Sequence, residues 1–419
     1  MLGVAASWME RRATLLILAL TPALLAGIRW FTHGVDIHQN RLPLAPPPQS
    51  LTLLVAACAV AAGALVVVAF SFVKTRVLAP YMLLAGAATV AGLAVAQPWL
   101  RLGLIELGAA LTVALVWQTA RAPARLTYLT VFLLSAASLI AGEVLLDRGQ
   151  QDWAWALLIT SASVKLAAVP LCFWLLSLAD EVPAVVLGLI IAVVDMAAFG
   201  EFCLSAQIVH GLIAPQHFLL VLGAATSFLA ALLMLSQRSL KRLLVLSTVE
   251  DVGFLLLGLA AVSALGTSGA LIAASSHALA KALLFACLSA PEAAGALDGE
   301  QAGLATRYPV SAFGFLFGML AMLGVPPTLG YIGRWRLYET ALQIGPLLLA
   351  VFILSSVFAL IAYVLALTRV WWGPGEDPAG SSSSREPLAL EATLIALVAM
   401  LLIAGLWPHG LQIFSGGGP

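Results

Sequence analysis

The stretch Ser268–Ala290 reads SGALIAASSHALAKALLFACLSA and contains no acidic side chain and only two basic ones, His277 and Lys281. A helix needs about 20 consecutive, mostly apolar residues to cross the hydrocarbon core of a bilayer. This stretch is therefore predicted to be a transmembrane helix that carries an imidazole and an amine inside the membrane.

The rest of the chain has the same apolar character. Of its 419 residues 62% are apolar and 10% are charged, and the mean hydropathy is +1.04. A soluble domain has about 45–50% apolar and about 25% charged residues, so a soluble enzyme, a nucleic-acid-binding protein and a disordered chain are excluded. Because long apolar runs recur throughout, we predict an all-α polytopic membrane protein and not a membrane β-barrel.

Breaks at proline, glycine and charge clusters divide the chain into about thirteen predicted spans. They lie at 13–30, 51–73, 79–96, 100–118, 126–146, 153–177, 183–206, 216–236, 243–264, 268–290, 310–331, 344–369 and 388–408. We expect three regions: N-terminal transmembrane helices over 1–78, a core over 79–340 and C-terminal transmembrane helices over 341–419.

The basic residues indicate the orientation, because positively charged loops stay on the cytoplasmic side. With the N-terminus inside, twelve Lys and Arg residues fall in inner segments and six in outer ones, Arg334 and Arg336 among the latter. This predicts a protein of the cell inner membrane with a cytoplasmic N-terminus and an outside C-terminus.

No motif for a prosthetic group is evident. The four cysteines lie in apolar segments without CxxC spacing, so neither a disulfide nor a metal site is predicted. We expect no cofactor and no metal in this chain, and any redox activity would belong to partner subunits. The formal net charge of zero gives no field that would recruit nucleic acid.

Several charged residues lie inside the predicted spans, where each one costs about 2.5–3.5 kcal/mol at the bilayer centre and is a candidate functional residue. They are Glu106, Lys165, Asp195, Glu201, Glu250, Asp251, His277 and Lys281. Structural alternatives stay open: Glu106 and Lys165 as a fixed ion pair, Glu201 as a snorkelling side chain, and Glu250 and Asp251 at a helix start.

Prolines interrupt two of the predicted spans. Pro170 follows Lys165, and Val325-Pro326-Pro327 precedes Arg334. Broken helices near the midplane are where transporters build ion sites, so we predict two related half-channels in two pseudo-symmetric bundles. His277 and Lys281 are four residues apart, hence on one helix face, and both side chains can exchange protons when removed from water.

Three motifs carry a family resemblance. They are Lys165-x4-Pro170-x3-Trp174; Ser239-Leu240-Lys241-Arg242-Leu243-Leu244 with Ser247-Thr248 and Gly253-Phe254; and His277-x3-Lys281-Ala282-Leu283-Leu284-Phe285. In this order, over roughly residues 80 to 340, they resemble the antiporter-like proton-translocating family. That family includes membrane-arm subunits of respiratory complex I, membrane-bound hydrogenases and Mrp-type sodium/proton antiporters.

The resemblance implies that Glu106 is the carboxylate partner of Lys165 and that His277 and Lys281 form a central relay. Two positions depart from the family pattern: Asp195 stands where a lysine or histidine is usual, and Asp251 stands where a histidine is common. A third departure is Arg334 or Arg336, near the lysine or glutamate of the second broken helix. Because an arginine does not release its proton at physiological pH, the resemblance does not imply proton exchange at this position of the second half-channel.

The resemblance implies a proton-translocating subunit of an NADH-quinone oxidoreductase or hydrogenase type complex. Its partners would be other membrane subunits, the lipid bilayer and protons, with sodium as the alternative ion. Three alternatives stay open: an Mrp-type sodium/proton antiporter subunit with carboxylate oxygens as sodium ligands, an energy-coupling subunit for inorganic carbon uptake, and a non-conducting scaffold subunit.

Overall fold

In a computed structural model, the chain is described over residues 49–95, 97–208, 213–297, 302–374 and 386–406. Every regular element in these ranges is helical, which confirms the all-α prediction. Nine of the described helices are long and apolar enough to cross a membrane, and two shorter ones, Ala79–Ala94 and Pro309–Met322, are also apolar. The span predicted at 13–30 lies outside the described residues.

The helices follow the predicted spans closely. The first half of the described chain contains α2 (Gln49–Ser71), α3 (Val73–Arg76), α4 (Ala79–Ala94), α5 (Pro98–Thr119), α6 (Ala122–Asp147), α7 (Gln151–Lys165), α8 (Phe173–Glu181), α9 (Ala184–Leu189), η1 (Ile190–Asp195) and α10 (Met196–Ile208). The second half contains α11 (Ile213–Leu235), α12 (Leu240–Ala260), α13 (Ala264–Cys287), α14 (Ser289–Ala293), α15 (Leu304–Arg307), α16 (Pro309–Met322), α17 (Leu329–Ile344), α18 (Pro346–Ala366), η2 (Leu367–Trp371) and α19 (Leu388–Leu406).

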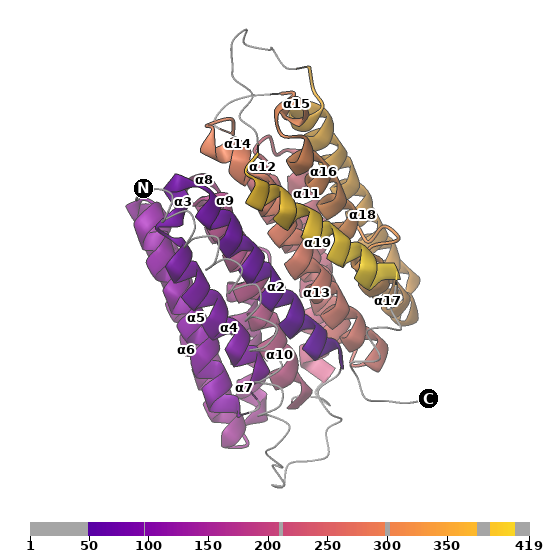
Figure 1. Cartoon of the computed structure of the whole chain (residues 1–419). Helices are drawn as coiled ribbons and strands as arrows, with labels where there is room; N and C mark the ends of the chain where they lie inside the picture. The colour runs from indigo at the N-terminus through magenta and orange to yellow at the C-terminus, as the bar shows by residue number, and fades with distance from the viewer. Residues whose placement is uncertain (1–48, 96, 209–212, 298–301, 375–385, 407–419) are drawn as a thin grey trace.

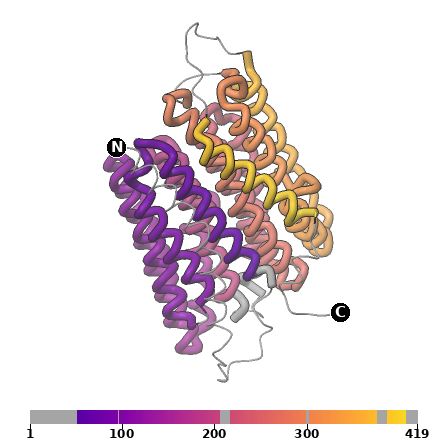
Figure 2. The backbone as a smooth tube through the Cα atoms, in the orientation of Figure 1, coloured from indigo at the N-terminus to yellow at the C-terminus, as the bar shows by residue number. Residues whose placement is uncertain are grey.

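The long helices run side by side along one direction (Figure 1). Helices α4 to α7 form one side and α11 and α16 to α18 the other, while α2 packs against α13 between them. Figure 2 shows α19 lying obliquely across the outside of the second side, against α13, α16 and α17. Helices α12 and α13 lie in the centre of the bundle, where nearly all of their residues are buried.

Small residues allow the central helices to approach closely. A Cβ atom added to Gly253 of α12 would lie 2.5 Å from the carbonyl oxygen of Gly223 in α11. Glycine at such a contact is typical of helix pairs in membranes. This contact helps to hold α12, which carries Glu250 and Asp251, at a fixed position in the bundle.

Both predicted helix breaks are present. Helix α7 ends at Lys165 and α8 begins at Phe173, with Pro170 between them. Helix α16 ends at Met322 and α17 begins at Leu329, after two prolines. A third irregularity was not predicted: the turns of Ile190–Asp195 are π-helical, and Asp195 is their last residue.

The segment that follows the second break is helical. Arg334 and Arg336, which are predicted in an outer segment, both lie within α17, and Arg334 is 3% exposed. The physical reason is that the prolines end only the first half of this span. The chain then resumes as a second half-helix whose buried side contains Leu329, Leu337 and Ala341.

Candidate functional site

The first charged cluster forms at the break between α7 and α8. The amine of Lys165 makes an ion pair with Oε1 of Glu106 on α5, and the two side chains are 8% and 11% exposed. The predicted proximity of these two residues is thus confirmed. The other carboxylate oxygen of Glu106 is buried and has no hydrogen-bond partner, so the cluster retains an open acceptor.

Asp195 joins this first cluster. It is 2% exposed, and its electrostatic partner is Lys165. Lys281 instead interacts with Asp251 and Glu250. Of the two buried lysines, Asp195 therefore accompanies Lys165.

The backbone groups freed by the first break find partners nearby. The indole of Trp174 donates to the carbonyl oxygen of Val164 at 3.1 Å, and the amide of Val169 donates to Oγ1 of Thr226 at 3.2 Å. A broken helix inside a membrane is stable only when such groups are satisfied. These contacts therefore hold Lys165 at the end of α7.

The second charged cluster centres on Arg334 of α17. Its guanidinium contacts both carboxylate oxygens of Glu250 at 3.3 Å and Oδ1 of Asp251 at 3.5 Å. It also donates to the carbonyl oxygen of Met322, at the end of α16, at 2.7 Å, and lies 3.8 Å from the ring centroid of Phe254. The guanidinium thus binds the helix break and the carboxylates together.

Glu250 and Asp251 do not lie at a helix start. Helix α12 begins at Leu240 after the capping residue Ser239, so the two carboxylates are about ten residues into the helix. They are 2% and 5% exposed. The helix-start alternative is wrong, because the chain is already helical at Leu240.

His277 and Lys281 both contact α12, so they share one helix face, as their spacing predicted. Nδ1 of His277 lies 2.7 Å from Oδ2 of Asp251, and Nε2 is buried without a hydrogen-bond partner. Lys281 donates to the carbonyl oxygen of Leu244 at 2.6 Å and to Oγ of Ser247. The imidazole therefore presents one free nitrogen to the interior, while the amine is held by neutral oxygens.

Some members of the two clusters were missed. Tyr363 of α18 donates to Oγ of Ser247 at 2.8 Å, and Tyr128 of α6 pairs with Thr112 at 2.8 Å while interacting with Glu106 and Asp195. The only available signal was a single phenol in an otherwise apolar run. Such residues often serve as plain packing residues, so that signal is weak.

Nothing in the described part of the chain suggests a metal centre. No group of three or more His, Cys, Asp or Glu side chains there is arranged to hold a metal ion, and all four cysteines are free and buried. The arrangement of charges instead suits proton exchange among carboxylates, amines and an imidazole.

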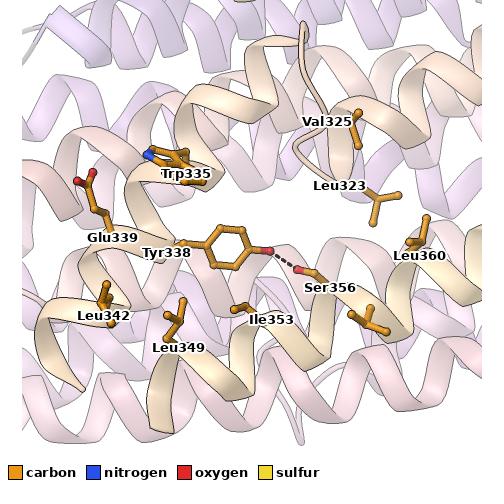
Figure 3. A pocket seen from close by; sticks show the side chains of 11 residues that line it. Leu323, Val325, Trp335, Tyr338, Glu339, Leu342, Leu349, Ile353, Ser356 and Leu360 are labelled. Atoms are coloured by element: carbon orange, nitrogen blue, oxygen red, sulfur yellow. Dashed lines mark hydrogen bonds between the residues drawn. The ribbon is translucent and has the colours of Figure 1, made fainter. Parts of the chain in front are cut away.

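A cavity of about 550 Å³ lies between α17 and α18 (Figure 3). Its lining is mainly aliphatic and aromatic, and it contains the hydrogen bond of 2.6 Å between Tyr338 and Ser356. Several lining residues, among them Trp335 and Ile353, are exposed on the outer face of the bundle. None of the predicted site residues lines this cavity.

The family with the description "NADH:quinone oxidoreductase/Mrp antiporter, TM" matches residues 108–359. The chain belongs to this family. The matched region contains the Lys165 break, Asp195, the carboxylates of α12, the basic residues of α13, and Arg334. Glu106 lies two residues before it.

Known relatives give the same family. NADH-quinone oxidoreductase subunit N of Moorella thermoacetica is 27% identical over 272 residues, which cover 62% of this chain and 55% of that protein. The matched region thus spans about half the length of this curated relative.

Solved structures show the same fold. A chain of respiratory complex I from Thermus thermophilus has a TM-score of 0.81 at 20% identity, covering 96% of this chain and 92% of that one. A chain of the Mrp complex from Dietzia sp. has a TM-score of 0.78 at 21% identity, covering 99% and 93%. The antiporter-like fold is therefore established for this multi-pass membrane protein.

Proposed function

We propose that this chain is a proton-translocating, antiporter-like subunit of a multi-subunit redox complex, of the NADH-quinone oxidoreductase or hydrogenase type. The observation that carries this proposal is the buried ion pair of Lys165 and Glu106 at a helix break, together with the buried Asp195, which interacts electrostatically with Lys165. Such a charge assembly is costly inside a membrane and typical of proton pathways. Family membership supports the same function.

The proposed roles follow from the geometry. Glu106, Lys165 and Asp195 exchange protons at the first break, and His277 and Lys281 form the central relay between α12 and α13. Asp251 orients the His277 ring through its contact at Nδ1. Arg334 keeps its proton, so its role is to hold Glu250 and Asp251 in place.

The proposed architecture has thirteen spans in two pseudo-symmetric bundles, with residues 79–340 as the proton-translocating core between N- and C-terminal helices. Its support is the repeated pattern of a proline-broken helix with a buried basic residue paired to a carboxylate, at Lys165 and at Arg334. We place the chain in the cell inner membrane with the N-terminus in the cytoplasm, the C-terminus outside and other membrane subunits as partners.

Replacing Lys165 tests the proposal. In the assembled complex in inside-out vesicles, Lys165→Ala is expected to abolish redox-driven proton translocation while the complex still assembles. The matched control is Lys241→Ala, which removes an amine paired with Glu292 outside both clusters. Wild-type proton flux in Lys165→Ala vesicles would refute the relay role.

A second candidate, cation/proton antiport, has one observation in its favour. The first cluster contains two carboxylates, Glu106 and Asp195, but one basic side chain, Lys165, and a hard cation such as sodium prefers oxygen ligands. Proton flux that rises with sodium and loses this dependence in Asp195→Asn would favour this function. Flux independent of sodium would favour the redox-driven pump, and no flux under any condition would favour the scaffold role.

A further inference from the structure

A group of polar side chains, here called the outer layer, lies between the first cluster and one end of the bundle. Its members are Arg101, Glu143 and Glu201, and the first cluster, which lies deeper, is called the deep cluster. Arg101 of α5 makes a two-point ion pair with Glu201 of α10, with Nη2 3.0 Å from Oε1. The two side chains are 11% and 2% exposed, so this is not a snorkelling carboxylate as the sequence suggested.

The layer reaches the surface through α6. The carboxylate of Glu143 accepts a hydrogen bond from Ser205 of α10 and interacts electrostatically with Glu201, Arg101 and Asp147. Glu143 is half-buried, and Asp147, the last residue of α6, is exposed. Carboxylates therefore run from the exposed end of α6 to the buried ion pair. Figure 1 shows α7 and α10 at this end of the molecule.

The spacing along two helices relates this layer to the Lys165 cluster. Arg101 and Glu106 are five residues apart on α5, and Asp195 and Glu201 are six residues apart across η1 and α10. At 1.5 Å per residue these separations are about 7.5 and 9 Å. Each helix thus contributes one residue to the deep cluster and one to the outer layer.

The positions between the two layers are apolar. Along α5 and α10 they include Leu102, Ile105 and Phe199, which are at most 7% exposed. Beyond them, the deep cluster has an acceptor, the unpartnered Oε2 of Glu106. A proton would cross this apolar interval when the ion pair opens and water or a side chain bridges it.

We infer that the Arg101–Glu201 pair is the gate of a proton access path that joins the surface at the end of α6 to Glu106 and Lys165. Glu143 exchanges protons with water, and Glu201, released from Arg101, passes a proton between Glu143 and the free oxygen of Glu106. The bonds formed and broken are O–H bonds only. In the proposed topology this surface is the outer one. The inference rests on the proposed function.

An apolar double variant tests whether the Arg101–Glu201 pair takes part in proton transfer or only holds α5 against α10. Arg101→Met with Glu201→Leu replaces the buried pair by packed apolar side chains, which often leaves stability unchanged or higher. In inside-out vesicles with the assembled complex, this variant is expected to assemble normally and to lose at least about tenfold in proton flux. Wild-type flux would show that the pair only locks α5 to α10.

Two milder variants keep the inference testable if the double variant does not assemble. Glu201→Gln and Glu143→Gln retain shape while removing the exchangeable proton, and each is expected to lower flux several-fold. The control is Asp180→Asn, which weakens the exposed pair with Arg242 and is expected to leave flux unchanged. If both amide variants pump at the wild-type rate, the path is wrong.

The two proposals fail in different ways. Flux that survives Lys165→Ala contradicts the proposed function. Flux that is lost in Lys165→Ala but unchanged in the Glu143 and Glu201 variants contradicts the gate alone.

Discussion

The two helix breaks contain different cations in otherwise similar settings. At the first break, Lys165 pairs with one carboxylate, Glu106 on α5, and interacts electrostatically with a second, Asp195. At the second, Arg334 is held by two carboxylates of α12. A lysine can give up its proton when its partner moves away, whereas an arginine cannot. The comparison therefore predicts that the first break exchanges protons and that the second is fixed.

The two clusters also differ in the balance of their acidic and basic side chains. Glu106 and Asp195 outnumber Lys165, so the first cluster is neutral only with one proton or cation added. In the second cluster Glu250 and Asp251 are matched by Arg334 and Lys281. Because a net charge is costly in a membrane, we expect the first cluster to hold an additional proton or cation, whereas the second is balanced as long as Lys281 carries its proton.

The largest expected effect is the loss of Arg334. Arg334→Ala removes the guanidinium that contacts both carboxylate oxygens of Glu250, and it frees the carbonyl oxygen of Met322. Breaking a buried pair in this way costs about 3–5 kcal/mol. We expect a sharp loss of assembled complex and a lower midpoint of thermal unfolding in detergent.

Lys165→Ala is the matched comparison for that experiment. Its cluster can regain neutrality by taking up protons on Glu106 and Asp195, so assembly is expected to be close to wild type while pumping is lost. Equal losses of assembly in Arg334→Ala and Lys165→Ala would break the distinction between a fixed and an exchanging cluster.

The sequence was sufficient to predict the helices from the apolar runs and both helix breaks from the prolines. It was also sufficient to predict the pairing of Glu106 with Lys165, because isolated charges buried in a membrane have few alternative partners. It did not reveal that α17 continues beyond Arg334, since a charged, aromatic-rich segment near a span end equally suits an interfacial loop. It also did not identify the partner of Glu201, because Arg101 lies 100 residues away and only tertiary packing brings them together.

A medium effect is expected at Asp195. Asp195→Asn removes the second carboxylate near Lys165 without changing shape, so we expect proton flux to fall several-fold with normal assembly. Asp195→Glu, which restores the carboxylate, is expected to recover part of the flux, as measured by dye quenching in inside-out vesicles. Undiminished flux in Asp195→Asn would assign this residue to helix packing and remove the charge imbalance from the comparison.

The smallest effect is expected at Phe254, whose ring lies 3.8 Å from the guanidinium of Arg334. A cation–π contact of this kind contributes about 0.5–2 kcal/mol, and Phe254 is fully buried, so Phe254→Leu removes it along with some ring packing. We expect a modest decrease in the thermal unfolding midpoint of the assembled complex and unchanged proton flux, because the carboxylates still hold the arginine. Phe254→Tyr, which retains the ring face, is the control for lost packing. A change of flux in Phe254→Leu at constant assembly would show that Arg334 moves during turnover, and the second cluster would then resemble the first.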